Sequence, residues 1–269
     1  MCGIAGILVG GSWSGSAVDV LAQSMGETLH HRGPDAAGHW SDGSGRVAFG
    51  HRRLSVVDLT PAGSQPMTSR DGRWTICYNG ELYNTDSLRA KVGLADGAYR
   101  GHSDTEVLVE LIAARGVDAA VCEAVGMFAF AVWDSHERQL WLARDRFGEK
   151  PLYIARSAGV VAFASEIRAV RGVPGLDRSI DVDALHDLIK YGYVVGDRSI
   201  LRGVRRLTPG TVGRMDSDLT VGAPVRYWSP DDEANESSRR PEHDERELLD
   251  VLSDAVRSRM VADVPLGAF

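Results

Sequence analysis

The chain has 269 residues, of which 43% are hydrophobic and 25% are charged, and its formal net charge at pH 7 is −7. This length is enough to bury a sizeable core in roughly one or two domains. The acidic balance and the scattered positions of lysine and arginine argue against a nucleic acid or an anionic membrane as a partner.

The cysteines and histidines indicate a chain without disulfides or bound metal. The three cysteines, Cys2, Cys77 and Cys122, are odd in number and far apart, and none forms a CxxC pair. The eight histidines show no HxxxH or HExxH spacing. We therefore expect a reducing, cytoplasmic environment and no metal site.

No segment predicts export or membrane insertion. The apolar run at 4–9 is short and no basic residue precedes it, which argues against a signal peptide. The apolar run at 125–133 is far shorter than the ~20 residues that cross a bilayer. These features predict a soluble protein.

Cys2 directly follows the initiator methionine. Because cysteine is small, we expect methionine aminopeptidase to remove Met1, which leaves a thiol and a free α-amine on one residue. A free thiol has a pKa of about 8.5 and needs a base at neutral pH, whereas an α-amine titrates at about 7.7–8.0 and can act as that base. A nucleophile activated by its own N-terminal amine is an established catalytic arrangement. The alternative is a cysteine that only packs in the first strand.

Short strands and a few helices follow along the chain. Apolar runs predict strands at 3–9, 47–53, 74–78, 127–133, 139–143, 152–155 and 160–164. Apolar residues at helical spacing predict helices at 18–29, 86–92, 104–115, 181–191 and 245–260. A loop is expected at 30–35 and a hairpin turn at 134–138. This order favours an α+β fold with antiparallel sheets covered by helices, because strict βαβ alternation is missing.

Two polar segments could serve a site or merely shape turns. The segment His-His-Arg-Gly-Pro-Asp at 30–35 either organises a turn or lies beside an active site. In the segment at 50–58, Arg53 stands at the end of a predicted strand and could bind a carboxylate through two hydrogen bonds. From this segment alone a surface cation is the simpler interpretation.

Two further segments carry candidate donors and acids. Asn79 and Gly80 offer a side-chain amide and a backbone N–H, the donors of an oxyanion hole, although Asn-Gly is also a hairpin-turn pair. Ser103 is expected to cap the following helix, with Glu106 at the capping-box position. Asp104 complements the helix dipole and could also bind an ammonium group.

The combination of these segments carries a resemblance to a known family. MCGIAGI, HRGPD, GHRRLSVVDL, YNGELYN, SDTEVL and RDRFGEKPLY occur in this order, followed by FASEIRAV and LTPG. The chain resembles the class II glutamine amidotransferase domain of the N-terminal-nucleophile (Ntn) hydrolases. It is most similar to the N-terminal half of glutamine-hydrolysing asparagine synthetases. The arginine-bearing segment differs in glucosamine-phosphate synthases and phosphoribosylpyrophosphate amidotransferases, and β-lactam synthetases lack the cysteine.

The resemblance implies a fold and a catalytic apparatus. The fold would be a four-layer αββα sandwich, with two antiparallel sheets between layers of helices. Cys2 would attack the side-chain amide of glutamine, and water would later release glutamate. Asn79 through its side chain and Gly80 through its N–H would hold the oxyanion.

The resemblance also assigns the residues that bind glutamine. Arg53 would pair with the α-carboxylate of glutamine, and Glu81 and Asp104 would receive its α-ammonium. The backbones of Leu54 and Val56 would complete the substrate slot. No cofactor is implied for this half of the reaction.

Three regions are expected along the chain: the glutaminase domain at 2–226, a linker at 227–244, and the first part of a synthetase domain at 245–269. In family members, the segment that corresponds to residues 263–269 leads into an ATP-binding SGGxDS loop. This sequence does not contain that loop. ATP and magnesium would therefore be needed only by a synthetase domain supplied in cis or in trans.

Three questions stay open from the sequence: the identity of the nitrogen acceptor, whether the domain is catalytic, and the oligomeric state. The nitrogen acceptor could be aspartate, as in asparagine biosynthesis, or another carboxylate in a specialised pathway. A non-catalytic regulatory domain is a third alternative, although it predicts a damaged site. A homodimer is common among relatives and is one candidate assembly, although the oligomeric state is not readable from the sequence.

Overall fold

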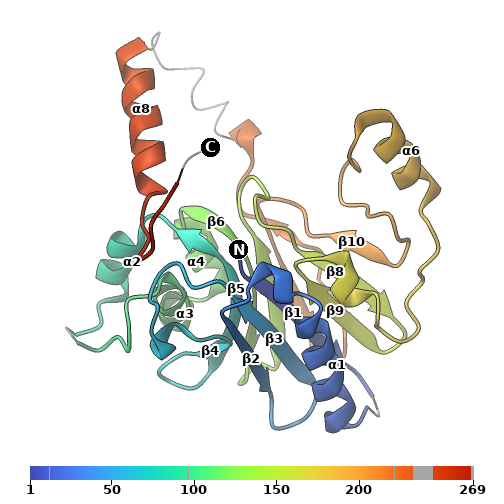
Figure 1. Ribbon diagram of the computed structural model, residues 1–269. Coiled ribbons are helices and arrows are strands. Elements are labelled where there is room, and N and C mark those ends of the chain that lie inside the picture. The colour runs from blue at the N-terminus through green and yellow to red at the C-terminus, as the bar shows by residue number, and fades with distance from the viewer. Residues whose placement is uncertain (12, 96, 221, 233–244, 268–269) are drawn as a thin grey trace.

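The computed structural model describes residues 1–269 except 12, 96, 221, 233–244 and 268–269 (Figure 1). The strands are β1 (Gly3–Val9), β2 (Ala36–Ser41), β3 (Val47–Arg53), β4 (Met67–Thr68), β5 (Trp74–Leu82), β6 (Gly126–Asp134), β7 (Gln139–Arg144), β8 (Tyr153–Ser157), β9 (Val160–Ala164), β10 (Val204–Arg206), β11 (Thr211–Asp216) and β12 (Val225–Arg226). The helices are α1 (Gly15–Glu27), α2 (Thr85–Val92), α3 (Asp104–Arg115), α4 (Val117–Glu123), α5 (Ile167–Val170), α6 (Val182–Tyr191) and α8 (Glu245–Ser258).

The strands form two antiparallel sheets that pack face to face. One sheet has the order β10-β8-β9-β1-β3-β2 and the other has the order β12-β11-β7-β6-β5-β4. Large apolar side chains fill the space between them, including Phe49, Phe163 and Trp133. A Cβ at Gly6 in β1 would lie 2.3 Å from the Phe163 ring, so the glycine leaves room for this aromatic layer.

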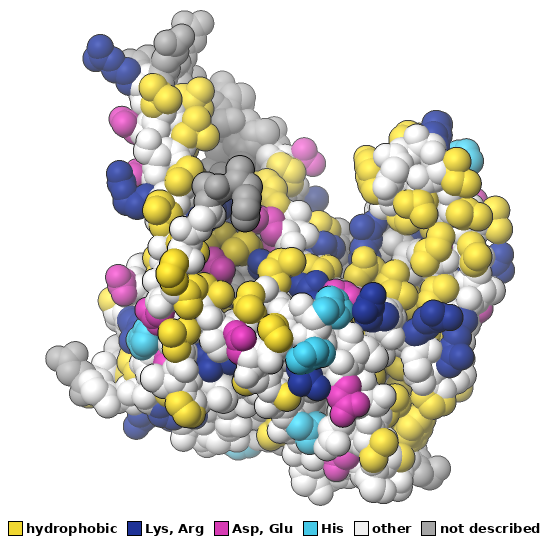
Figure 2. All heavy atoms as spheres, in the orientation of Figure 1, with side chains coloured by type: hydrophobic (Ala, Val, Ile, Leu, Met, Phe, Trp, Pro, Cys, Tyr) yellow, Lys and Arg dark blue, Asp and Glu magenta, His cyan; other side chains and the backbone are white. Residues whose placement is uncertain are grey.

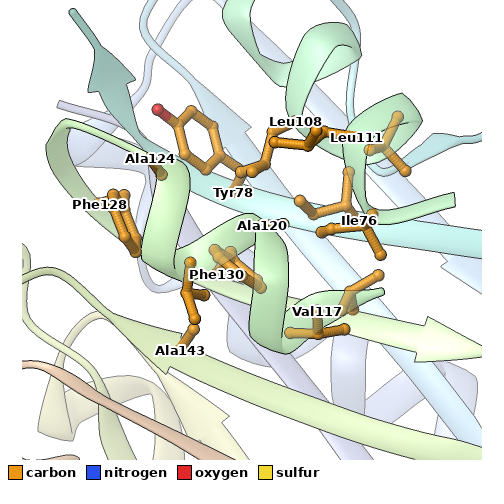
Figure 3. Packing of buried hydrophobic residues seen from close by; sticks show 14 of the residues in the cluster. Ile76, Tyr78, Leu108, Leu111, Val117, Ala120, Ala124, Phe128, Phe130 and Ala143 are labelled. Atoms are coloured by element: carbon orange, nitrogen blue, oxygen red, sulfur yellow. The ribbon is translucent and has the colours of Figure 1, made fainter. Parts of the chain in front are cut away.

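Helices cover both outer faces and complete a four-layer αββα arrangement. Helices α3 and α4 bury the outer face of the β5–β6 sheet, and Figure 3 shows Ile76, Leu108 and Phe130 in that layer. On the opposite side, α1 and α5 pack against β1, β3, β8 and β9. The predicted α+β fold with two antiparallel sheets is therefore confirmed.

Strand registers determine which residues reach the edge where the chain begins. Gly3 of β1 pairs with Arg52 of β3, and Gly80 of β5 pairs with Phe128 of β6. The hairpin turn considered for Asn79 and Gly80 is wrong, because β5 continues to Leu82 along β6. Pairing with β6 outweighs the local turn preference of Asn-Gly.

The start of α3 differs in one detail from the predicted capping box. Ser103 caps the helix as expected, since its hydroxyl accepts from the Glu106 N–H at 3.3 Å. The Glu106 carboxylate instead accepts from the N–H groups of Arg100 and Gly101 at 2.9 and 3.0 Å. In a capping box the Glu106 carboxylate would accept from the Ser103 N–H. Here the residues before the helix supply the N–H groups that it binds.

Helix α8 rises away from the sandwich on the side where the chain begins (Figure 1). Its apolar side chains are exposed, for example Leu248 at 59% and Val256 at 61%. Figure 2 shows hydrophobic side chains along α8 and also around α6. Most of the predicted linker, residues 233–244, lies outside the described residues, so the expected division into three regions stays a prediction. None of the described helices is long and apolar enough to cross a membrane.

The buried cluster under α3 and α4 predicts that shortening one of its aromatic side chains strongly destabilises the protein. Phe130 is fully buried in this cluster, so we expect Phe130→Ala to lower the free energy of unfolding by about 3–5 kcal/mol. Urea denaturation followed by fluorescence measures this loss. Val20→Ala on α1, at a side chain that is 65% exposed, is the control and should have a far smaller effect. Equal midpoints for the two variants would contradict this packing.

Candidate active site

One pocket opens at the edge where β1 begins and where β3 and β5 end. It brings together all eight of the residues predicted from the sequence: Cys2, Arg53, Leu54, Val56, Asn79, Gly80, Glu81 and Asp104. They come from strands of both sheets, from the residues just before β1 and just after β3, and from the first turn of α3. Packing of the two sheets therefore assembles a site whose parts are far apart in the sequence.

The Cys2 thiol lies against the backbone that follows β3. The Leu54 N–H donates to Cys2 Sγ at 3.5 Å, and Sγ lies 3.7 Å from the Leu54 carbonyl oxygen. Burial raises the pKa of the Cys2 thiol, and the hydrogen bond with Leu54 opposes this only in part. The thiol is therefore protonated at neutral pH and needs a base in order to act as a nucleophile.

The α-amine of the chain lies in the same neighbourhood. Here it belongs to Met1, and burial lowers the pKa of this amine while the charge of a Cys2 thiolate opposes the shift. Lys150 and Arg32 lower the same pKa further. An amine in this environment is more often neutral than one in water, which suits a proton acceptor.

The segment at 30–35 supports the backbone around Cys2. Arg32 donates from Nε to the Cys2 carbonyl at 3.0 Å and is held in turn by Glu166 at 3.1 Å. The Asp35 carboxylate accepts from the Ser55 N–H at 2.8 Å. The segment has two interpretations, a turn and a segment beside an active site. Its hydrogen bonds to Cys2 and Ser55 favour the second.

Arg53 is buried and shapes the loop that follows β3. Its guanidinium donates to the carbonyls of Thr60 at 3.0 Å and Val57 at 3.3 Å, and also to that of Asp58. Among the described residues it makes no ion pair with a carboxylate. The side chain is 7% exposed and lines the pocket, and its charge is only partly compensated by the carbonyl dipoles. Such a cation fits an anionic ligand group.

Two residues of β5 that line the pocket, Asn79 and Gly80, carry hydrogen-bond donors. The Asn79 side-chain nitrogen is buried and has no hydrogen-bond partner in the described part of the chain. The N–H groups of Tyr78 and Leu82 point away from β6, to Gln65 at 2.7 Å and Asp104 at 3.0 Å. Because backbone N–H groups two residues apart in a strand point the same way, the Gly80 N–H between them also points away from β6.

Gly80 is required by the close approach of β6. A Cβ at this position would lie 2.4 Å from the Met127 carbonyl oxygen and 2.7 Å from the Phe128 Cβ. Any larger residue would push β5 away from β6 and displace the N–H. The glycine therefore allows β5 and β6 to approach closely at this position.

Glu81 and Asp104 provide a pair of carboxylates on the wall of the pocket. Asp104 accepts hydrogen bonds from the Tyr78 hydroxyl at 2.9 Å and from the Leu82 N–H at 3.0 Å, while burial raises its pKa. Burial also raises the pKa of Glu81, and the charge of Asp104 raises it further. Two acids that repel each other in a buried place are stabilised when a cation binds between them.

Lys150 also lines the pocket, and the sequence analysis did not single it out. Its side chain is 6% exposed, and burial lowers its pKa although the charge of Glu81 opposes this. The loop before it is organised by Asp145, whose carboxylate accepts from the N–H groups of Glu149 at 2.9 Å and Lys150 at 3.0 Å. The motif RDRFGEKPLY contained the residue, but no local pattern indicated that it would reach Glu81.

No group of three or more potential metal-ligating side chains occurs within the described ranges of the chain. The polar groups of the pocket include a guanidinium, a lysine ammonium, the α-amine, two carboxylates, a thiol, hydroxyls and amide donors. This set is suited to a small zwitterionic ligand and a nucleophilic thiol.

The family assignment follows from comparison with known proteins. The model of the glutamine amidotransferase domain family matches residues 1–228, so the chain belongs to this family. A putative glutamine-hydrolysing asparagine synthetase of Mycobacterium tuberculosis is 35% identical over 291 aligned residues, covering 100% of this chain and 43% of the relative. Glutamine-hydrolysing asparagine synthetase 1 of Bacillus subtilis is 34% identical and is covered to 42%. The chain thus spans less than half the length of these relatives.

A solved structure supports the same fold. The glutamine phosphoribosylpyrophosphate amidotransferase of B. subtilis superposes with a TM-score of 0.62 at 21% identity, over 84% of this chain and 49% of that protein. At this identity the likeness concerns the fold alone.

The buried thiol predicts slow alkylation of Cys2. In protein that retains Met1, a raised pKa leaves less thiolate at pH 7 than in a free cysteine, so iodoacetamide should modify Cys2 slowly and faster as the pH rises. Peptide mass spectrometry measures this rate against the exposed Cys122 in the same protein. Modification of Cys2 at pH 7 as fast as that of Cys122 would contradict the raised pKa.

Proposed function

We propose that the chain hydrolyses glutamine to glutamate and ammonia with Cys2 as an N-terminal nucleophile. The observation that carries the proposal is the unpartnered Asn79 amide nitrogen in the same pocket as the Cys2 thiol. A buried donor without a partner is costly, and an oxyanion formed next to it would satisfy it.

In the first half of the reaction, the Cys2 α-amine freed by removal of Met1 accepts the thiol proton, and Sγ attacks the side-chain amide carbon. The carbonyl oxygen becomes an oxyanion held by the Asn79 side chain and the Gly80 N–H. The carbon–nitrogen bond breaks, and the departing nitrogen takes a proton from the α-ammonium and leaves as ammonia. A glutamyl thioester remains on Cys2.

In the second half, water attacks the thioester carbon while the α-amine accepts a proton from it. The same two donors hold the second oxyanion. Its collapse breaks the carbon–sulfur bond, returns the proton to Sγ and releases glutamate. The enzyme is regenerated without a metal or cofactor in this half-reaction.

Specificity follows from charge complementarity. Arg53 binds the α-carboxylate, and Glu81 and Asp104 bind the α-ammonium, with the backbones of Leu54 and Val56 along the slot. A substrate lacking either charged group would leave a buried charge in the pocket without a partner, which is strongly unfavourable.

The relatives motivate a wider proposal for the whole protein. The chain would be the glutaminase half of an ATP-dependent asparagine synthetase of the cytoplasm, with ATP and magnesium bound by a synthetase domain in cis or in trans. An acceptor carboxylate other than aspartate is the alternative for that domain, and a homodimer is the proposed assembly. A regulatory domain without catalysis is less well supported, because every predicted site residue lines the pocket.

Glutamate release from glutamine tests the proposed activity. We expect Cys2→Ala to reduce the rate by more than about a thousandfold, because alanine offers no nucleophile. Alanine is also small, so Met1 should still be removed and intact mass can verify this in both proteins. Hydrolysis that survives in Cys2→Ala would rule out the mechanism, as would full activity in protein that retains Met1.

Two neighbouring arginines allow a matched test of carboxylate binding. Arg53→Ala should raise KM for glutamine by roughly 10- to 100-fold, because hydrogen bonds to a charged group are lost. Arg52→Ala is the control, since Arg52 lies next in β3 but donates to the Gly26 carbonyl at 3.4 Å outside the pocket. Equal KM values for the two variants would remove Arg53 from the site.

A further inference from the structure

The chain beyond the amidotransferase match returns to the pocket after α8. Asp263 lies outside the matched residues 1–228, yet its N–H donates to the Val56 carbonyl at 2.8 Å. Its carboxylate accepts from the Asp58 N–H at 2.7 Å and lies 2.6 Å from His102 Nε2. Three contacts therefore join this late segment to the loop that follows Arg53 and to the residue before the α3 cap.

The loop that Asp263 contacts is the loop that holds the Arg53 guanidinium. Arg53 donates to the carbonyls of Val57, Asp58 and Thr60. Asp58 has a positive φ of 54°, a conformation that a non-glycine residue adopts only when its surroundings hold it. Its N–H is bound by Asp263 and its carbonyl by Arg53. One peptide segment thus connects the two side chains.

The Asp58 side chain links this loop to α3 as well. It is fully buried and accepts from the Thr60 hydroxyl at 2.5 Å and from the His102 N–H at 2.9 Å. His102 precedes Ser103 and Asp104, so the same network reaches the proposed ammonium-binding acid. The contacts of Asp263 with Asp58 and His102 therefore belong to a hydrogen-bond network that joins the loop after Arg53 to the start of α3.

A second pocket adjoins the first, and residues of the segment after α8 line it. It is lined by Val57, Glu81 and Asp104, which also line the glutamine pocket, and by Ser258, Val261 and Asp263 from the late segment. Arg259 lies over the ring of Tyr83, 4.7 Å from its centre, on the same wall. Residues 258–263 are thus a wall next to the substrate slot.

We propose that Asp263 is a positioning residue for glutamine binding: it holds the Val56–Asp58 backbone in the conformation that aims Arg53 at the substrate carboxylate. The inference rests on the proposed function. It assigns a residue outside the matched domain to the affinity of the glutamine site, and it makes that affinity depend on how the segment after α8 is seated.

Steady-state kinetics and hydrogen exchange of the full chain test the proposal together. Asp263→Ala should raise KM for glutamine by about tenfold with little change in kcat, because substrate binding is affected and the nucleophile is not. Deuterium uptake in the peptide covering 54–60 should become faster, since the Asp58 N–H loses its acceptor. Asp263→Asn keeps an acceptor oxygen and should lie nearer to the unchanged protein in both measurements.

Two controls separate positioning from a general structural effect. Asp254→Ala removes an exposed acid of α8 that pairs with Arg257 at 2.7 Å, and it should change neither measurement. The rate at which iodoacetamide modifies Cys2 should be the same in Asp263→Ala and the unchanged protein, because that reagent carries no carboxylate for Arg53.

Each other outcome contradicts the proposal. Unchanged KM in Asp263→Ala, with or without faster exchange, would show that the contact does not govern glutamine binding. A fall in kcat or in Cys2 alkylation at constant KM would place the effect on the nucleophile. If the unchanged chain releases no glutamate, the proposed function itself fails. If the chain is active but Asp263→Ala leaves KM unchanged, only this inference is wrong.

Discussion

The register between β1 and β3 is the constraint on which the site depends. Gly3 pairs with Arg52, so continuation of the pairing sets Cys2 opposite Arg53 at the open end of both strands. A slip of one residue would turn every side chain of β1 to the other face and remove the thiol from the pocket. The register is well determined, because β1 lies in the middle of its sheet and is buried along its whole length.

A second constraint is that the pocket is built around groups whose interactions are incomplete. A buried arginine bound to backbone carbonyls, a buried Asp104 that raises the pKa of Glu81, and an Asn79 amide donor with no partner among the described residues each cost stability. The buried sheets and helical layers can offset this cost. A ligand with one carboxylate, one ammonium and one amide carbonyl would satisfy all of these groups, which connects the packing of the fold to the choice of substrate.

Local sequence signals predicted what depends on short-range patterns. The apolar runs at 3–9, 47–53 and 160–164 match β1, β3 and β9, and the eight proposed site residues meet in one pocket. Strand β2, in which no residue is fully buried, and the strands β10 to β12 gave no such signal. Lys150 and Asp263 were missed because their importance arises only from contacts between distant segments. The turn considered at Asn79 was wrong for the same reason, since pairing with β6 decides the strand.

The central claim is that the Cys2 sulfur receives the acyl group of glutamine. Acid quenching during turnover, followed by digestion and mass spectrometry, would locate a glutamyl group on the chain. The account predicts a glutamyl thioester on the N-terminal peptide that begins with Cys2, and far less of it in the Asn79→Ala protein at the same time point, because one oxyanion donor is lost. A glutamyl group on Cys122, or hydrolysis with Cys2 unmodified throughout turnover, would contradict it.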